Sequence, residues 1–398
     1  MRIAIIHDYL NQYGGAERVL EAFCELFPDA PIYTLFYDEE KTLGRFKGKK
    51  IITSFLDLSF SRRRESRIGD WIPGQARNDG EGIAASRTPR NDGNIVSNHH
   101  RLFIPLMPIA ASLMKVSDDY DVVLSSSAGF GKGMRVGKNT IHISYCHTPL
   151  RYAWEHYKYF NWPTYLKILS APAFWYLRKW DKWAGRKPQK LIANSRYIAG
   201  KIKNYYKKEA SVIYPPVDTK KFCIKPKVKK GEYFLAVGRL IHYKKFDLII
   251  QAFNKLNLPL LIIGNGPELE NLKQLARSSK IEFLISITDE QLVILYNGAQ
   301  AFIFPQVEDF GLVAAEAQAC GTPVIALNQG GGKEIVIDGK TGILFNNQNV
   351  DDLIMAVKRF QIRKFDPKII RASALRFSKN KFKKEILKAV RTSLNNNS

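Results

Sequence analysis

The sequence predicts an α/β protein built from two doubly wound domains that face a cleft. The first observation is size, because 398 residues, 45% of them hydrophobic, suffice for two or three domain cores. The second is a repeated alternation of short apolar runs with helical periodicity, which is typical of parallel sheets covered by helices. The third is a stiff, extended segment between the two halves, Tyr214-Pro215-Pro216-Val217-Asp218.

The first half, residues 1–213, opens as a strand, a glycine loop and a helix. An apolar run at 2–8 precedes Gly14-Gly15, and helical periodicity follows. This order is the usual opening of a doubly wound domain. We expect further buried strands at 32–36, 122–125, 140–146, 191–194 and 211–213.

Residues 61–98 interrupt this pattern. They are rich in Arg, Gly, Asn, Asp and Ser, and the segments 77–80 and 90–93 both read Arg-Asn-Asp-Gly. A long polar stretch without apolar periodicity does not build a core. We therefore predict a disordered surface insertion at 61–98.

The second half repeats the alternation after a linker at 214–230. The domain at 231–375 has expected strands at 233–237, 258–263, 281–285, 301–304 and 323–326. Its expected helices are at 246–256, 269–278, 290–298 and 312–320, with later helices starting near Val350 and Asn380. We expect the last segment, 376–398, to be a helix that packs back on the first domain.

Composition excludes several classes of protein. No apolar run approaches the ~20 residues of a membrane-spanning helix. The four cysteines are far apart, which argues against a disulfide framework or zinc knuckle and favours the cytoplasm.

The net charge is +24, and residues 151–230 hold 20 basic against 4 acidic residues. Such a zone attracts phosphate-bearing partners: a nucleotide, an anionic lipid or a nucleic acid.

Two clusters of polar residues follow expected strands of the second half. Arg239 comes directly after the strand at 233–237, and Lys244 lies five residues later. A forked guanidinium and an ammonium at the carboxyl end of a strand suit a diphosphate. The alternative is a solvated pair of cations near a turn.

The other cluster is Glu308-Asp309-Phe310-Gly311-Leu312, followed by Glu316. Gly311 permits close approach of a ligand to the backbone, and the amides of the helix start suit an anion. Two carboxylates eight residues apart across such a turn can each bind hydroxyls of a polyol. Favourable placement at a helix N-terminus explains Glu308, but it explains poorly a Glu316 amid apolar neighbours.

His147 is a third candidate, because Ser144-Tyr145-Cys146-His147-Thr148-Pro149 follows another strand. A histidine at the predicted cleft is placed to contact a ligand. A buried structural histidine is the competing interpretation.

The combination of motifs resembles glycosyltransferase family 4, also called group 1. It consists of Glu-x7-Glu at 308–316, Val-Gly-Arg-Leu at 237–240 with Lys244, the Gly14-Gly15 loop, and Tyr-Pro-Pro-Val-Asp. The segments 146–155 (CHTPLRYAWE) and 193–198 (ANSRYI) resemble the bacterial O-antigen mannosyltransferase branch. The resemblance implies the GT-B fold of two Rossmann-like domains and a retaining enzyme that uses a nucleotide-sugar.

The resemblance also implies roles for individual residues. Arg239 and Lys244 are expected to neutralise the donor diphosphate without a metal ion. Glu316 is expected to hold the ribose hydroxyls, Glu308 to contact the transferred sugar, and His147 to lie near its C6 hydroxyl. Backbone contacts are expected from Gly14, Gly15, Phe310, Gly311 and Leu312.

One departure from the family pattern concerns the nucleobase. The loop that usually meets the base carries a glycine in many members, whereas 284–288 (LISIT) has none. The resemblance to the mannosyltransferase branch favours GDP-mannose as donor.

We therefore expect a metal-independent hexosyltransferase without a cofactor, which moves mannose to a lipid-linked or polysaccharide acceptor in lipopolysaccharide or O-antigen synthesis. The alternatives are a nucleotide-sugar epimerase on the same fold, or a non-catalytic binder of nucleotide-sugar or nucleic acid. No nucleic-acid module is recognised, so a nucleic-acid partner is not expected.

The basic zone is also aromatic, which bears on the acceptor. Lysines and arginines alternate with aromatic residues, a composition that suits an anionic membrane surface. We expect peripheral association with the inner face of the cytoplasmic membrane. A core-packed helix with solvated lysines is the alternative. The aromatic residues are Trp154, Tyr157, Tyr159, Phe160, Trp162, Tyr165, Phe174, Trp175, Tyr176, Trp180 and Trp183.

Overall fold

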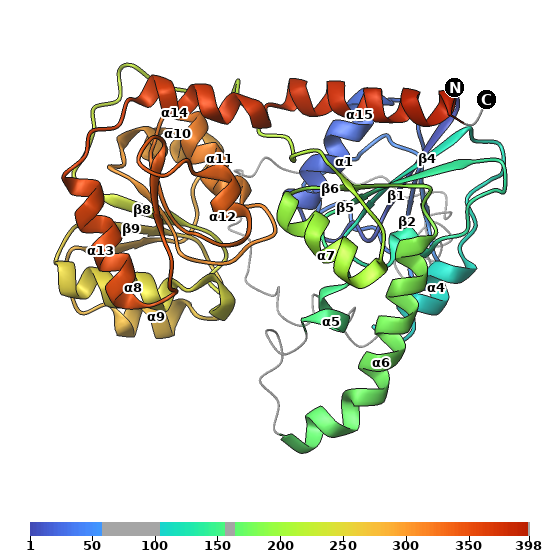
Figure 1. The fold of residues 1–398 in the computed structure, drawn as a ribbon, viewed down its shortest axis with the longest axis horizontal. Helices are drawn as coiled ribbons and strands as arrows, with labels where there is room; N and C mark the ends of the chain where they lie inside the picture. The colour runs from blue at the N-terminus through green and yellow to red at the C-terminus, as the bar shows by residue number, and fades with distance from the viewer. Residues whose placement is uncertain (58–103, 156–163, 397–398) are drawn as a thin grey trace, which may run out of the picture.

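The computed structural model describes residues 1–57, 104–155 and 164–396, which form two α/β domains (Figure 1). The predicted fold class is confirmed, because each domain has one parallel sheet with helices packed against it. The predicted insertion at 61–98 lies outside the described residues, as do Tyr157, Tyr159, Phe160 and Trp162.

The N-terminal sheet has seven parallel strands in the order β3-β2-β1-β4-β5-β6-β7. In the pairing of β1 with β4, Ile3 lies beside Val122 and His7 beside Ser126. The carboxyl ends of the central strands therefore bring polar residues together. The strands are β1 (Ile3–His7), β2 (Ile32–Thr34), β3 (Ile51–Thr53), β4 (Val122–Ser127), β5 (Ile141–Cys146), β6 (Lys190–Ala193) and β7 (Ser211–Val212).

Alternate residues of β1 are buried in two separate cores, one on each face of the sheet. Ile3 and Ile5 join the core beneath helix α1 (Gly15–Leu26), whereas Ala4 and Ile6 face the opposite side. Burial on both faces explains why the strand reads as an unbroken apolar run. The other helices are α4 (Met107–Leu113), η1 (Gly131–Gly133), α5 (Arg151–Trp154), α6 (Thr164–Arg186) and α7 (Arg196–Tyr206).

The C-terminal sheet has six parallel strands in the order β10-β9-β8-β11-β12-β13. Its strands are β8 (Phe234–Val237), β9 (Leu260–Ile263), β10 (Ile281–Leu284), β11 (Phe302–Phe304), β12 (Val324–Leu327) and β13 (Gly342–Phe345). Its helices are η3 (His242–Lys244), α8 (Phe246–Leu256), α9 (Leu269–Leu275), α10 (Asp289–Gly298), α11 (Leu312–Ala319), α12 (Gly330–Ile335) and α13 (Val350–Gln361).

The chain ends by returning to the N-terminal domain. After α14 (Pro367–Ala374) and η4 (Leu375–Phe377), which lie above the C-terminal domain in Figure 1, helix α15 (Lys379–Asn395) runs along the top of the N-terminal domain. The ring of Phe382 stacks on Phe23 at 5.8 Å and meets the edge of Tyr145 at 5.7 Å. Helix α15 thus completes the core of the domain in which the chain begins.

Several element boundaries differ from the sequence prediction. The expected helix at 269–278 ends at Leu275, because the backbone N–H groups of Arg277 and Ser278 instead donate to Oδ1 of Asn254. The strand expected at 32–36 ends at Thr34. Strands β3 and β13 and helices α4, α5, α7, α12 and α14 were not predicted, and α6 was considered only as an alternative. In the part of the chain that the structure describes, no helix is long and apolar enough to cross a membrane.

Candidate active site

Some of the predicted site residues lie where the two domains meet, since Glu316 pairs with Arg18 and Gly15 faces Leu312. From the N-terminal domain come the start of α1 and the ends of β1, β4 and β5. From the C-terminal domain come the segments after β8 and β11, two strands that are neighbours in the sheet. This is the carboxyl edge of each sheet, where open α/β domains bind ligands.

Lys244 and Glu308 form an ion pair within the C-terminal domain. Lys244 ends η3, and Glu308 lies in the loop between β11 and α11. Their side chains are 17% and 18% exposed, and Nε2 of Gln306 donates to the same Glu308 oxygen at 3.2 Å. The structure therefore brings together the cation predicted for the diphosphate and the carboxylate predicted for the sugar.

Glu316 is buried in helix α11 and pairs with Arg18 of helix α1, across the two domains. Burial raises the pKa of Glu316, and the Arg18 guanidinium acts against that rise. The same ion pair raises the pKa of Arg18. Arg18 was not predicted as a site residue, although it directly follows the Gly14-Gly15-Ala16-Glu17 segment.

The glycines on the two sides of this interface permit close contact. Gly311 begins α11 with φ +100°, and a Cβ there would lie 2.5 Å from the ring of Phe304. A Cβ on Gly15 would lie 3.0 Å from Cδ1 of Leu312. A side chain at position 311 would collide with Phe304, whereas a side chain at position 15 would require Leu312 to shift. The neighbouring Phe310 is buried, with its ring 5.2 Å from that of Phe377.

His147 is buried just after β5, where its Nε2 lies 2.8 Å from Oγ of Ser126. The same hydroxyl oxygen lies 3.2 Å from Nδ1 of His7. Burial lowers the pKa of His147 to about 3. His147 is therefore neutral across the physiological pH range.

Arg239 differs from the other candidates. Its side chain is exposed and forms no hydrogen bond or ion pair with the residues that the structure describes. It lines a hollow of about 290 Å³ at the ends of β8, β9 and β10, together with Asn265 and residues 285–287. This hollow contains the loop that the resemblance relates to the nucleobase. A larger hollow of about 730 Å³ lies at the opposite ends of the strands and includes none of the predicted residues.

Further contacts join the domains around this region, and sequence reasoning missed them. Asp309 pairs with Arg151 and, at 3.4 Å, with Lys201. Burial acts to raise the pKa of Asp309, but Arg151 and Lys201 outweigh it and lower the pKa. Glu334 of α12 accepts from the backbone N–H of Arg196 at the start of α7, at 2.9 Å.

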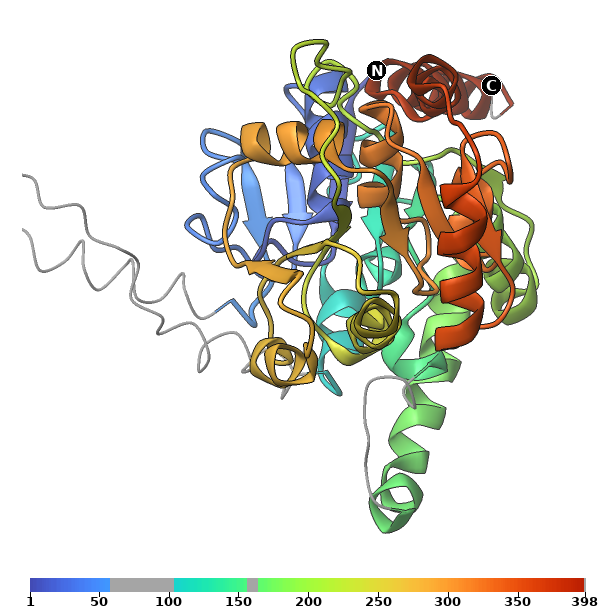
Figure 2. The same ribbon diagram turned by 90° about the vertical axis from the view of Figure 1, so that its left-hand side faces the viewer.

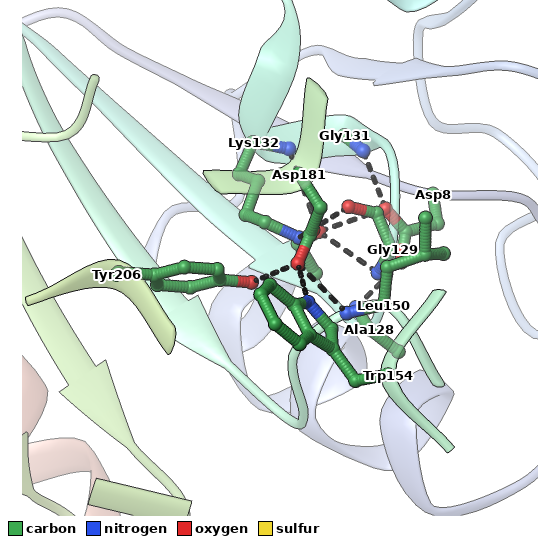
Figure 3. A network of polar contacts seen from close by, with 10 residues as sticks. Asp8, Ala128, Gly129, Gly131, Lys132, Leu150, Trp154, Asp181 and Tyr206 are labelled. Carbon is green, nitrogen blue, oxygen red and sulfur yellow. Dashed lines mark hydrogen bonds and ion pairs between the residues drawn. The ribbon is translucent and has the colours of Figure 1, made fainter. Parts of the chain in front are cut away.

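A buried polar network supports the N-terminal side of the site (Figure 3). Nζ of Lys132 lies 2.8 Å from Oδ1 of Asp181, and both side chains are fully buried. Oδ2 of Asp181 accepts from Nε1 of Trp154 at 2.7 Å and from the hydroxyl of Tyr206 at 2.9 Å. Asp181 of α6 thereby ties α5, α7 and the loop after β4 together.

Two protein families match the chain. The family described as "Glycosyl transferases group 1" matches residues 217–384, and "Glycosyltransferase Family 4" matches residues 72–221. Both matched families are glycosyltransferases, and their matches follow one another along the chain. The second match begins within the stretch that we interpret as an insertion.

Curated glycosyltransferases match parts of the chain. A GDP-mannose-dependent α-(1-6)-phosphatidylinositol monomannoside mannosyltransferase of Mycolicibacterium smegmatis is 31% identical over 192 residues, 41% of this chain and 50% of that protein. An uncharacterized glycosyltransferase of Methanocaldococcus jannaschii is 32% identical over 182 residues, 44% of this chain and 50% of that protein. The chain thus spans about half the length of the curated relatives it matches.

Solved glycosyltransferase structures share the whole fold. HepE of Anabaena in complex with UDP has a TM-score of 0.67 at 16% identity, covering 98% of this chain and 100% of that one. The lipopolysaccharide outer core galactosyltransferase WaaB has a TM-score of 0.64 at 19% identity, covering 98% and 99%. At such identities the likeness establishes the two-domain fold alone.

Proposed function

We propose that this protein is a retaining, metal-independent group 1 glycosyltransferase that transfers mannose from GDP-mannose to a lipid-linked or polysaccharide acceptor in cell-surface glycan synthesis. The observation that carries the proposal is the Lys244–Glu308 ion pair, with Glu316 of the following helix paired to Arg18 of the other domain. Exposed Arg239 follows β8, the strand next to the one that precedes Glu308. The set offers cations for a diphosphate and carboxylates for hydroxyl groups.

The reaction breaks the bond between the sugar and the diphosphate, whose negative charge grows as it leaves. Arg239 and Lys244 stabilise that charge, so the reaction does not require a divalent ion. Binding of the donor separates Lys244 from Glu308, because the ammonium turns to phosphate and the carboxylate to the sugar. The acceptor attacks from the face that the diphosphate leaves, and the anomeric configuration is retained.

We propose GDP-mannose as the donor for two reasons. The segments 146–155 and 193–198 resemble the mannosyltransferase branch, and the Mycolicibacterium relative is GDP-mannose-dependent. UDP-sugars are the main competitors, because HepE binds UDP on the same fold.

We also propose that helix α6 contacts an anionic membrane that carries the acceptor. Both views show α6 extending away from the two domains (Figure 1, Figure 2). Its large apolar side chains Leu169 and Trp175 are 74% and 61% exposed. Lys179 lies over the ring of Trp175, and Lys187 over that of Trp183, at 5.3 and 3.7 Å. Cations beside exposed aromatic rings suit a lipid headgroup region.

Vesicle sedimentation tests the membrane contact. The protein should pellet with vesicles that contain anionic lipid at low salt, and the double change Leu169→Ser and Trp175→Ser should release it. Met355→Ser is the matched control, because Met355 is 58% exposed on α13 of the other domain. Equal pelleting of all three proteins would exclude α6 as the contact.

A transfer assay tests the reaction. The protein is incubated with GDP-mannose, EDTA and a lipid extract, and both GDP release and the anomeric configuration of the product are measured by NMR. We expect GDP release and an α-linked product, as in the donor. A β-linked product would contradict retention, and conversion of the donor sugar without GDP release would indicate an epimerase.

A further inference from the structure

Four buried polar residues lie one after another from helix α1 to His147. Oε1 of Glu17 lies 3.6 Å from Nε2 of His7, and Nδ1 of His7 lies 3.2 Å from Oγ of Ser126. The same Oγ lies 2.8 Å from Nε2 of His147. All four side chains are at most 9% exposed. The pairing of β1 with β4 fixes the centre of this row of residues, since His7 and Ser126 are register partners.

The charge state of Glu17 determines the direction in which hydrogen bonds are donated at one end of this row of residues. Its Oε2 accepts the backbone N–H of Gly14 at 2.8 Å. Burial acts to raise the pKa of Glu17, but His7 and the backbone N–H donors outweigh it and lower the pKa. Glu17 is therefore an ionised carboxylate, which accepts hydrogen bonds and donates none.

The remaining proton positions follow in order. A carboxylate facing Nε2 of His7 favours the proton on that nitrogen, which leaves Nδ1 as an acceptor. The Ser126 hydroxyl then donates to Nδ1 of His7, and its oxygen can only accept from Nε2 of His147. The proton of His147 is thus on Nε2, and its Nδ1 carries a lone pair.

A charged His7 would reverse this order. Both its nitrogens would donate, Ser126 would donate to His147, and the proton of His147 would lie on Nδ1. The tautomer spectra described below distinguish the two orders, because they place the proton of His147 on different nitrogens.

We propose that Glu17, acting through His7 and Ser126, is a positioning residue that holds His147 in the Nε2–H tautomer, so that Nδ1 accepts a hydroxyl group of the donor sugar. Among the described residues, no hydrogen bond reaches Nδ1 of His147. The use of this nitrogen by a sugar rests on the proposed function. The tautomer itself does not, because it is a property of the protein without substrate.

The variant Glu17→Gln provides a sharp test. The Gly14 N–H requires an acceptor, so the amide oxygen occupies the place of Oε2 and the NH₂ group faces His7. A donor in that place moves the proton of His7 to Nδ1, turns the Ser126 hydroxyl round, and moves the proton of His147 to Nδ1. Glu21→Gln is the matched control, since Glu21 lies one turn later and bonds Tyr13 instead.

Two-bond ¹H–¹⁵N correlation spectra of histidine side chains identify the protonated nitrogen. We expect Nε2–H on His7 and His147 in the wild type and in Glu21→Gln, and Nδ1–H on both in Glu17→Gln. Nδ1–H on His147 of the wild type would overturn the proposal even if no variant folds. So would an unchanged tautomer in a folded Glu17→Gln variant.

The contact between His147 and the donor sugar is tested by a separate measurement. Titration with GDP-mannose should shift the Nδ1 resonance of His147, whereas GDP alone should leave it in place. Glu17→Gln should lower kcat/KM about tenfold, the effect of one lost hydrogen bond to the sugar. A confirmed tautomer without a response to GDP-mannose would refute the sugar contact, while failure of all nucleotides to bind would refute the proposed function.

Discussion

Arg18 of helix α1 and Glu316 of helix α11 form an ion pair between the two domains, although 298 positions separate them in the sequence. The carboxylate that we expect to hold the ribose is therefore already bound to a guanidinium. Donor binding requires the ribose hydroxyls to share or replace this partner. The N-terminal domain thus reaches directly into the nucleotide side of the proposed site.

Glu316→Gln tests the ribose contact. The change removes the charge that accepts hydroxyl donors, and a hydrogen bond to a charged group contributes about 1.5–3 kcal/mol. We expect GDP to bind roughly 10- to 100-fold more weakly, as measured by calorimetry. The control is 2′,3′-dideoxy-GDP, which should bind equally to both proteins. If the wild type binds GDP and the dideoxy compound with equal affinity, Glu316 does not hold the ribose.

Arg239→Ala tests the role of the exposed cation after β8. Loss of one preorganised group that stabilises the leaving charge costs about 3 kcal/mol, so kcat/KM should fall by about two orders of magnitude. Lys358→Ala is the control, because Lys358 is an exposed cation on α13. A variant with the kinetics of the control would place the diphosphate elsewhere.

Lys132→Met tests the buried network of Figure 3. The change leaves the Asp181 carboxylate without its cation in a place that water does not reach. Breaking such a buried pair costs about 3–5 kcal/mol of unfolding free energy, which urea denaturation measures. The exposed Lys138→Met should change that free energy by no more than about 0.5 kcal/mol. Similar losses in the two variants would show that the ion pair is dispensable.

His142→Asn tests the acid sensitivity of the fold. Burial lowers the pKa of His142 to about 3, and the same cause acts on His147. The unfolded chain binds a proton on each near pH 6.5, whereas the folded chain does not until about pH 3, so acidification favours unfolding. Between these two pKa values, each histidine lowers the free energy of unfolding by about 1.4 kcal/mol for every unit that the pH falls.

Urea denaturation between pH 6 and pH 5 measures this effect. The slope of the unfolding free energy against pH should fall by about half in His142→Asn, whatever the loss of stability at neutral pH. An unchanged slope would mean that His142 is charged in the folded state.

Local patterns predicted most of the fold. Helix α8 has the predicted bounds, Phe246–Leu256, because its apolar residues repeat at helical spacing. The order of Glu308, Gly311 and Glu316 likewise predicted a loop followed by a helix, as the structure has it. In each case neighbouring residues determine the outcome.

The contacts between distant residues could not be predicted in this way. Arg18 was not singled out, and Asp309 was considered only as part of the loop before α11. Only the assembled domains show their partners. His147 was found from its position after a strand. Its connection to Glu17 depends on the register of β1 with β4, which no local pattern encodes. The same holds for α15, whose core partners lie at the other end of the chain.

The central claim is that the interface between the domains binds a guanosine diphosphate sugar without a metal ion. Thermal unfolding with GDP, UDP or ADP, each with EDTA or magnesium, tests it most directly. A nucleotide at 100 times its Kd stabilises the fold by about 2.7 kcal/mol. We predict that GDP raises the Tm most, equally with EDTA and magnesium, and that Arg239→Ala abolishes the rise. No rise with any nucleotide, or a rise that requires magnesium, would contradict the account.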